Sequence, residues 1–153
     1  MSDTLSLKEM SPVIEEVLSS GGKVRITASG KSMEPVIKDC EDTVVISEIQ
    51  NPLAVGDIVL YKRANGRLVL HRIVAINGSE ITLRGDSQWT TETVDKSVIL
   101  GILEAVERNG KVLKLNNMYF KKYKITLPAI RWKNRIINSI KIRLGAKTND
   151  KHS

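Results

Sequence analysis

The sequence predicts a mainly β fold, antiparallel and rich in hairpins, with an N-terminal helix before the β core and a basic helix after it. Two observations support this class. Residues 23–115 consist of short β-branched runs, as expected for strands. Three Asn-Gly pairs separate such runs, and Asn-Gly favours tight hairpins because both residues tolerate positive φ. The pairs are Asn65-Gly66, Asn77-Gly78 and Asn109-Gly110.

The spacing of apolar residues predicts a helix over about residues 5–20, with one apolar face. This face consists of Met10, Val13, Ile14, Val17 and Leu18. Two start signals compete. Ser6 with Glu9 would form a capping box, whereas Ser11 followed by Pro12 would begin the helix later.

Seven segments within the predicted β core have the alternation or β-branched composition of strands. They are Val24–Ala28, Thr43–Ile46, Asp57–Lys62, Leu68–Ile76, Ile81–Arg84, Val98–Glu107 and Lys111–Leu115. Hairpin connections between them predict an antiparallel sheet with little helix.

The distribution of charge divides the chain into two parts. Residues 1–118 hold 14 Lys and Arg against 16 Asp and Glu, whereas residues 119–153 hold 10 against 1. We therefore expect a nearly neutral catalytic domain over 1–118, a basic amphipathic segment over 119–145 and a disordered tail over 146–153.

Cys40 is the single cysteine, which excludes an internal disulfide.

The loop from Ser29 to Pro35 is the strongest candidate for a functional site. It follows a predicted strand, and its Gly and Ser residues would leave the Ser32 hydroxyl exposed while Met33 turns into the core. A serine needs a nearby base to attack an amide. The chain has two histidines, and His152 lies in the polar tail, so His71 is the base by elimination. His71 lies within a predicted strand, and hairpin folding would bring it to Ser32.

Five segments, taken in order, resemble the boxes of the type I signal peptidases, which share a superfamily with the self-cleaving SOS repressors of the LexA type. They are Gly30-Lys31-Ser32-Met33-Glu34-Pro35, Val55-Gly56-Asp57-Ile58-Val59, His71-Arg72-Ile73-Val74, Arg84-Gly85-Asp86-Ser87 and Ile99-Leu100-Gly101. The resemblance covers about residues 24 to 108. Within the superfamily, the chain is similar to the histidine branch, which includes the endoplasmic-reticulum and archaeal enzymes. It implies a signal-peptidase/LexA-like β fold.

The resemblance also implies roles for single residues. Ser32 would be the nucleophile, His71 the general base and Asp86 the acidic partner of the histidine. The loop residues Gly30, Lys31 and Met33 would form the oxyanion and substrate region, where the Ser32 backbone N–H is the expected oxyanion donor.

Histidine members often carry a second aspartate a few residues after the first. Glu92 and Asp95 both lie near that place, and neither matches it cleanly. The choice among Asp86, Glu92 and Asp95 stays open on the sequence. Neither a metal nor a cofactor is expected for a Ser-His mechanism.

The apolar neighbours of these boxes have two interpretations. Met33, Val36, Ile37 and Leu70 would line shallow pockets that accept small residues, or they would simply belong to the core.

The basic segment over 119–145 suggests a partner. Its apolar stripe, its cations and Trp132 suit the surface of an anionic membrane, and packing on the β core is the equal alternative. Clustered cations also suit phosphates, but nothing here resembles a module that reads nucleic-acid bases. No run approaches the ~20 apolar residues needed to span a bilayer, and no basic stretch followed by an apolar core opens the chain. We therefore expect a cytoplasmic enzyme or one peripheral to the inner face of the cell membrane.

The leading hypothesis is a serine endopeptidase of signal-peptidase type that cleaves a leader, signal or propeptide after small residues. One alternative is a self-cleaving LexA-like regulator, which needs an upstream scissile bond; the residues before Ser32 contain no Ala-Gly pair. The other is a non-enzymatic binding module for membrane or nucleic acid on a relic peptidase fold.

Overall fold

The computed structural model describes residues 8–114. These residues form one short α-helix, one 3₁₀ helix and eight strands. The elements are α1 (Ser11–Ser19), β1 (Lys23–Thr27), β2 (Thr43–Ser47), β3 (Ile58–Lys62), β4 (Leu68–Asn77), β5 (Glu80–Arg84), β6 (Glu92–Asp95), the 3₁₀ helix η1 (Lys96–Val98), β7 (Ile99–Arg108) and β8 (Lys111–Lys114). The predicted mainly β class with an N-terminal helix is confirmed.

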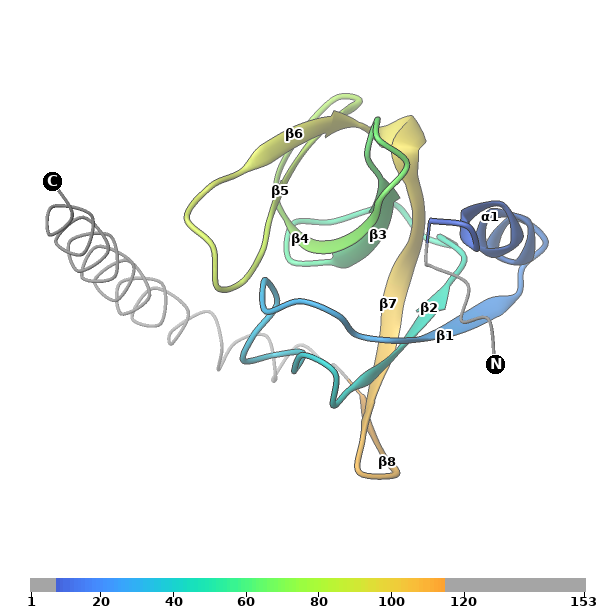
Figure 1. The fold of residues 1–153 in the computed structure, drawn as a ribbon. Coiled ribbons are helices and arrows are strands. Elements are labelled where there is room, and N and C mark those ends of the chain that lie inside the picture. Colours follow the sequence, from blue (N-terminus) through green and yellow to red (C-terminus); the bar gives the residue numbers. More distant parts are fainter. Residues whose placement is uncertain (1–7, 115–153) are drawn as a thin grey trace, which may run out of the picture.

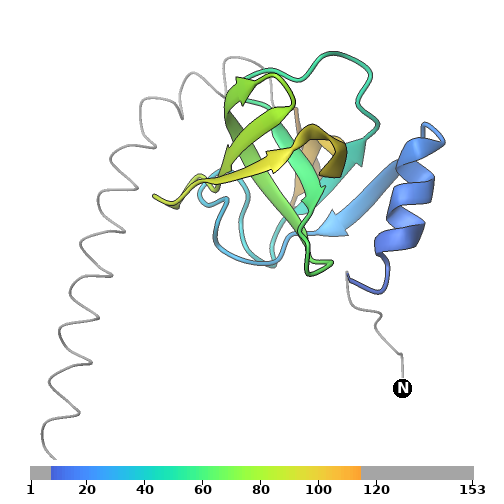
Figure 2. The same ribbon diagram turned by 90° about the horizontal axis from the view of Figure 1, so that it is seen from above.

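The strands form one antiparallel sheet in the order β1-β2-β7-β3-β4-β5-β6, with β8 also paired to β7. The long strand β7 joins the two halves of the sheet, because it pairs with β2 at one edge and with β3 at the other. Figure 1 shows β7 running through the molecule, with β3 to β6 curled on one side and β1, β2 and α1 on the other. Figure 2 shows α1 lying alongside β1.

All three Asn-Gly pairs join neighbouring antiparallel strands, as predicted. They connect β3 to β4, β4 to β5 and β7 to β8. At the last of them both residues have positive φ, 51° at Asn109 and 72° at Gly110, which is the backbone that a two-residue turn of this kind requires.

The helix is shorter than the 5–20 predicted. It begins at Ser11 with proline in its first turn, and residues 8–10 form a turn. The later of the two start signals therefore operates, because Pro12 has a fixed φ and lacks the N–H that a preceding helical turn would use. Residues 5–7 lie outside the described residues, as do Leu115 and the whole segment 119–153.

Strand β6 was absent from the sequence prediction. It is short, its sequence is Glu-Thr-Val-Asp, and it lies at the edge of the sheet, paired with β5 alone among the described strands. An edge strand with one half-buried apolar residue has no hydrophobic alternation from which to recognise it.

Two apolar clusters fill the two faces of β3. Ile58 and Leu60 belong to the cluster under α1 and the Ser32 loop, whereas Val59 and Tyr61 belong to the cluster with β5 and β7. Successive side chains of a strand point to opposite faces, so β3 is covered on both sides. This buried strand pairs with β4 and so supports His71, which β4 carries.

Candidate active site

The predicted nucleophile lies on a compact loop between β1 and β2. The Met33 carbonyl accepts from the Ile37 N–H at 2.9 Å, and the Lys31 carbonyl accepts from the Glu34 N–H at 3.2 Å. Met33 is buried, so it anchors the loop in the core as predicted, while Ser32 stays half-buried at the surface. Gly30 has a φ of 99° and donates its N–H to the Asp39 carboxylate, which closes the loop on its own far end.

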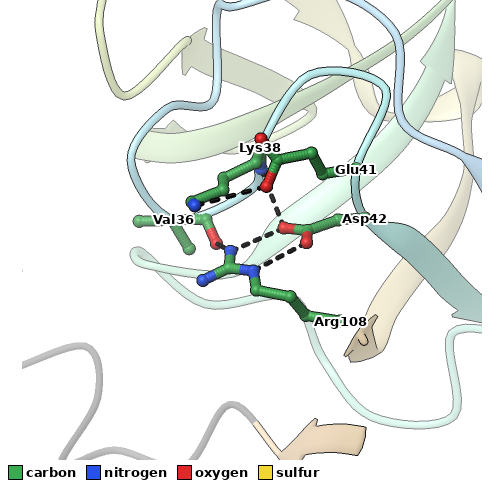
Figure 3. Close-up of polar contacts among 5 residues, drawn as sticks. All are labelled: Val36, Lys38, Glu41, Asp42 and Arg108. Carbon is green, nitrogen blue, oxygen red and sulfur yellow. Dashed lines mark hydrogen bonds and ion pairs between the residues drawn. The ribbon is translucent and has the colours of Figure 1, made fainter. Parts of the chain in front are cut away.

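A partly buried ion pair fixes the end of this loop to β7 (Figure 3). Arg108 donates to both carboxylate oxygens of Asp42, at 2.7 and 2.6 Å, and to the Val36 carbonyl at 3.3 Å. The Lys38 N–H donates to the same carboxylate. Burial raises the pKa of Asp42, but the hydrogen bonds from Arg108 and Lys38 outweigh it, so this pKa lies below its usual value. The carboxylate is therefore a charged anchor for the nucleophile loop.

The loop after β5 packs directly against the Ser32 loop. The Ser87 N–H donates to the Ser32 carbonyl at 2.9 Å, and the Ser87 hydroxyl donates to the Lys31 carbonyl at 2.7 Å. A Cβ on Gly85 would lie 2.7 Å from that Ser32 carbonyl oxygen. Glycine is needed here because the two backbones approach too closely for a side chain.

His71 is buried on β4, with 4% of its surface exposed. Its Nδ1 lies 3.1 Å from the hydroxyl of Tyr61, which is itself fully buried on β3. Burial lowers the pKa of His71, and the Arg63 charge lowers it further, against the opposing charges of Glu92 and Asp86. The ring is therefore held neutral near pH 7, which is the form that a general base needs.

Ser32 and His71 line the same cleft, of about 760 Å³. Among the described residues, neither the Ser32 hydroxyl nor His71 Nε2 makes a hydrogen bond, so Nε2 is the nitrogen left for the serine. Such bonds are often long before substrate binds. Within residues 8–114 the Ser32 N–H also has no partner, which agrees with the oxyanion role expected of it.

The predicted acidic partner, Asp86, is fully buried and engaged by arginine. Arg72 donates to both of its carboxylate oxygens at 2.7 Å and to the Gly56 carbonyl at 2.8 Å. This ion pair fixes the loop after β5 to β4. Within the described residues His71 makes no hydrogen bond to Asp86, so orientation of the ring by this residue stays a prediction.

The two further acidic candidates differ in position. Glu92, at the start of β6, accepts from Arg63 through both oxygens, and its charge acts on His71. Burial raises the pKa of Glu92, but the Arg63 hydrogen bonds outweigh it and lower the pKa overall. Asp95 is exposed and accepts from the Ser97 N–H at the start of η1. Of the two, Glu92 is the residue whose charge influences the pKa of His71.

Apolar side chains line much of the cleft beside Ser32. Met33, Ile37 and Leu70 belong to its lining, whereas Val36 is buried in the core. Residues 68–71 of β4 also line it, and within the described sheet β5 pairs with β4 only from Arg72 onward. The first part of β4 therefore presents an unpaired strand edge to the cleft.

The sequence missed several residues that hold the site. Tyr61, Arg63 and the Asp42–Arg108 pair were not singled out. One signal existed for the tyrosine: the Asn65-Gly66 hairpin places Val59 opposite His71, so Tyr61, two residues along, shares the histidine's face. No local pattern marks the pair of Asp42 with Arg108, which are 66 positions apart.

Within residues 8–114 no group of three or more His, Cys, Asp and Glu residues could hold a metal ion. In the same range no helix has the length and apolarity to cross a membrane.

Comparison with known proteins agrees with this geometry. A search of curated proteins finds no match. The family model described as Peptidase S24-like matches residues 2–113, which include the Ser32 loop, His71 and the three acidic candidates. This match places the chain in the serine peptidase superfamily that holds the LexA-like proteins and the signal peptidases, as the sequence predicted. The chain belongs to the Peptidase S24-like family of serine peptidases.

Proposed function

We propose that the protein is a serine endopeptidase of signal-peptidase type, which cleaves a leader, signal or propeptide after small residues by a Ser32–His71 mechanism. The observation that carries this proposal is the shared cleft, where a half-buried serine and a buried histidine, each with an atom free for the other among the described residues, face the same space.

The chemistry follows from the charge state of the ring. Neutral His71 takes the Ser32 proton on Nε2 while Oγ bonds to the peptide carbonyl carbon, and the oxyanion forms near the Ser32 N–H. The same Nε2 proton then passes to the leaving amine as the C–N bond breaks. Water, activated by the same nitrogen, hydrolyses the acyl-enzyme and restores the serine.

The shape of the cleft supports an extended peptide as substrate. The unpaired edge over residues 68–71 offers backbone groups to a strand, which is the general way that proteins bind extended peptides. Apolar side chains beside Ser32, including Met33 and Leu70, restrict the space next to the cut. Small residues before the scissile bond fit such a surface.

The test is cleavage of a peptide library carrying Ala-X-Ala sites by the full chain, with products identified by mass spectrometry. We expect cuts after small residues by the wild-type protein and none by Ser32→Ala. The intact mass of the chain is followed in the same samples. A chain that cuts itself and no added peptide would favour a LexA-like self-cleaving regulator instead, and cleavage by Ser32→Ala equal to wild type would refute the proposal.

A further inference from the structure

The cleft that holds Ser32 and His71 carries more positive than negative charge. Apart from the histidine, its charged lining residues are Lys31, Glu34, Arg63 and Arg67. A peptide bound there would meet three cations and one carboxylate. Which of these cations the fold itself already neutralises decides which is left for a ligand.

Two of the cations face each other at the hairpin between β3 and β4. The Arg63 N–H donates to the Arg67 carbonyl at 2.9 Å, one position beyond the last residue pair of the two strands. The turn itself is held by a bond from the Gly66 N–H to the Arg63 carbonyl and by one from the Arg67 N–H to the Asn65 side chain. Like charges that face each other across paired strands repel, so this arrangement calls for carboxylates.

One carboxylate neutralises one of the two arginines. Glu92 on β6 accepts from Arg63 through both of its oxygens, at 2.6 to 3.1 Å. The exposed Arg67 guanidinium makes no hydrogen bond or ion pair with any residue of the described range 8–114. Glu34, the acidic residue of the cleft lining, likewise forms no ion pair within these residues. Arg67 therefore presents a cation to the cleft that this part of the chain does not neutralise.

The position of Arg67 determines which part of a substrate it would reach. Arg67 precedes His71 by four positions, so in an extended backbone the two are about 13 Å apart. Alternate side chains of a strand share a face, which places Arg67 on the face of His71. Residues 68–71 have an unpaired edge in the described sheet, and a peptide strand added to that edge would keep the same spacing. A substrate residue about four positions from the scissile bond would therefore lie beside Arg67.

We propose that Arg67 determines substrate specificity by binding the carboxylate of an aspartate or glutamate about four residues from the scissile bond. A guanidinium pairs with a carboxylate through two parallel hydrogen bonds, which gives the contact both charge and shape selectivity. This inference rests on the proposed peptidase function, and it adds an acidic position to the preference for small residues at the cut.

The test uses matched pairs of fluorescently labelled peptides with one Ala-X-Ala site. Within a pair, glutamate or glutamine occupies the same position, about three to five residues from the cut on either side in turn. The ratio of kcat/KM for the glutamate over the glutamine peptide is compared within each protein, so a general change in activity cancels. For the wild-type full chain at low salt we expect a ratio of about 3 to 10 at neighbouring positions on one side of the cut.

Two substitutions of the arginine and one control give this ratio its meaning. Arg67→Gln should bring it to about one, and Arg67→Lys should keep part of it, because the charge remains while the paired hydrogen bonds are lost. Lys96→Gln removes the same unit charge from an exposed position outside the cleft lining, so its ratio should equal that of the wild-type protein. Added salt should lower the wild-type ratio, because it screens exposed charges.

Binding separates this inference from the peptidase proposal. The affinity of the same peptides for Ser32→Ala is measured by fluorescence anisotropy, which needs no cleavage. Tighter binding of a glutamate peptide, lost when Arg67→Gln is added, would support the inference even if the wild-type chain cleaves none of the peptides. Ratios near one at every position in both assays, or a preference that survives Arg67→Gln, would overturn it. Cleavage that depends on Ser32 would then leave the peptidase proposal standing.

Discussion

At the scale of single residues, the site depends on a histidine that is kept neutral and a serine that is kept in place. Burial and the Arg63 charge lower the pKa of His71, and Gly85 lies in close contact with the carbonyl of Ser32, the proposed nucleophile. Each of these features makes a separate prediction.

The first prediction concerns pH. In the proposed mechanism neutral His71 is the active form, so kcat/KM should rise with pH through the His71 pKa and be lost as pH falls below it. Because this pKa lies below the usual 6.5, activity should be half-maximal at a pH under 6.5. A pH–rate profile between pH 4.5 and 8 measures this. His152→Gln should show the same pH dependence of kcat/KM as the wild-type protein. Half-maximal kcat/KM above pH 7 in the wild-type protein would contradict the assignment of His71 as the base.

The second prediction concerns Gly85→Ala. The new Cβ would meet the Ser32 carbonyl oxygen at 2.7 Å, so the nucleophile loop must move. We expect the free energy of unfolding to fall by ~1–3 kcal/mol, as for other overpacked sites. We also expect kcat/KM to fall by about 10²-fold, since small displacements of reacting groups cost that much.

Gly78→Ala separates these two effects. Gly78 has a φ of 61° in the β4–β5 turn, and no described atom lies within 4 Å of the place that a Cβ would take, so alanine there adds backbone strain without touching the site. Denaturant unfolding should show a loss of ~1–2 kcal/mol with activity unchanged. Equal activity loss in both variants would show that Gly85 acts through stability alone.

At the scale of elements, the nucleophile loop is held by contacts that are distant in sequence. The Asp42–Arg108 pair ties its end to β7 (Figure 3). Ser87 ties its middle to the loop after β5. The loop is thus held by contacts to β7 and to the loop after β5 as well as by its own hydrogen bonds.

Arg108→Gln tests this anchoring. The substitution leaves the fully buried Asp42 carboxylate without its bidentate partner, and breaking such a pair typically costs ~3–5 kcal/mol. Urea denaturation at pH 7 should show a loss of this order. Lys23→Gln is the control, because the Lys23–Glu104 pair is exposed on both sides and exposed pairs contribute at most ~1 kcal/mol. Equal losses in the two variants would contradict the role given to Asp42.

Elements were predictable from the sequence to the extent that they carry local signals. Seven strands were predicted within one or two residues of their observed or described ends, because apolar alternation and Asn-Gly turns mark them. Strand β6 and the late start of α1 were not, because the strand has a single apolar residue and the helix had two competing start signals. Ser32 and His71 could be singled out from their motifs, whereas Tyr61, Arg63 and Arg108 act through contacts that only the folded sheet creates.

At the scale of the whole molecule, the charge is segregated: 10 of the 24 Lys and Arg residues lie in 119–153. We propose from the sequence that residues 119–145 bind anionic membrane surfaces, where each nearby cation contributes ~1 kcal/mol.

Vesicle co-sedimentation tests this proposal. The full chain should bind phosphatidylserine-containing vesicles and be released by salt. A variant with glutamine at residues 131, 133, 135, 141 and 143 should bind much more weakly. Equal binding by the two proteins would contradict it, and neither should bind vesicles of neutral lipid alone.

In the proposed mechanism, Ser32 attacks a peptide bond with His71 as its base. The decisive measurement is kcat/KM on one Ala-X-Ala peptide for the wild-type chain, Ser32→Ala, His71→Gln and the control Ser20→Ala, which alters an exposed serine at the end of α1. We predict a loss of at least ~10³-fold in each site variant, because triad members act as a unit, and full activity in the control. Wild-type rates in Ser32→Ala would contradict this mechanism.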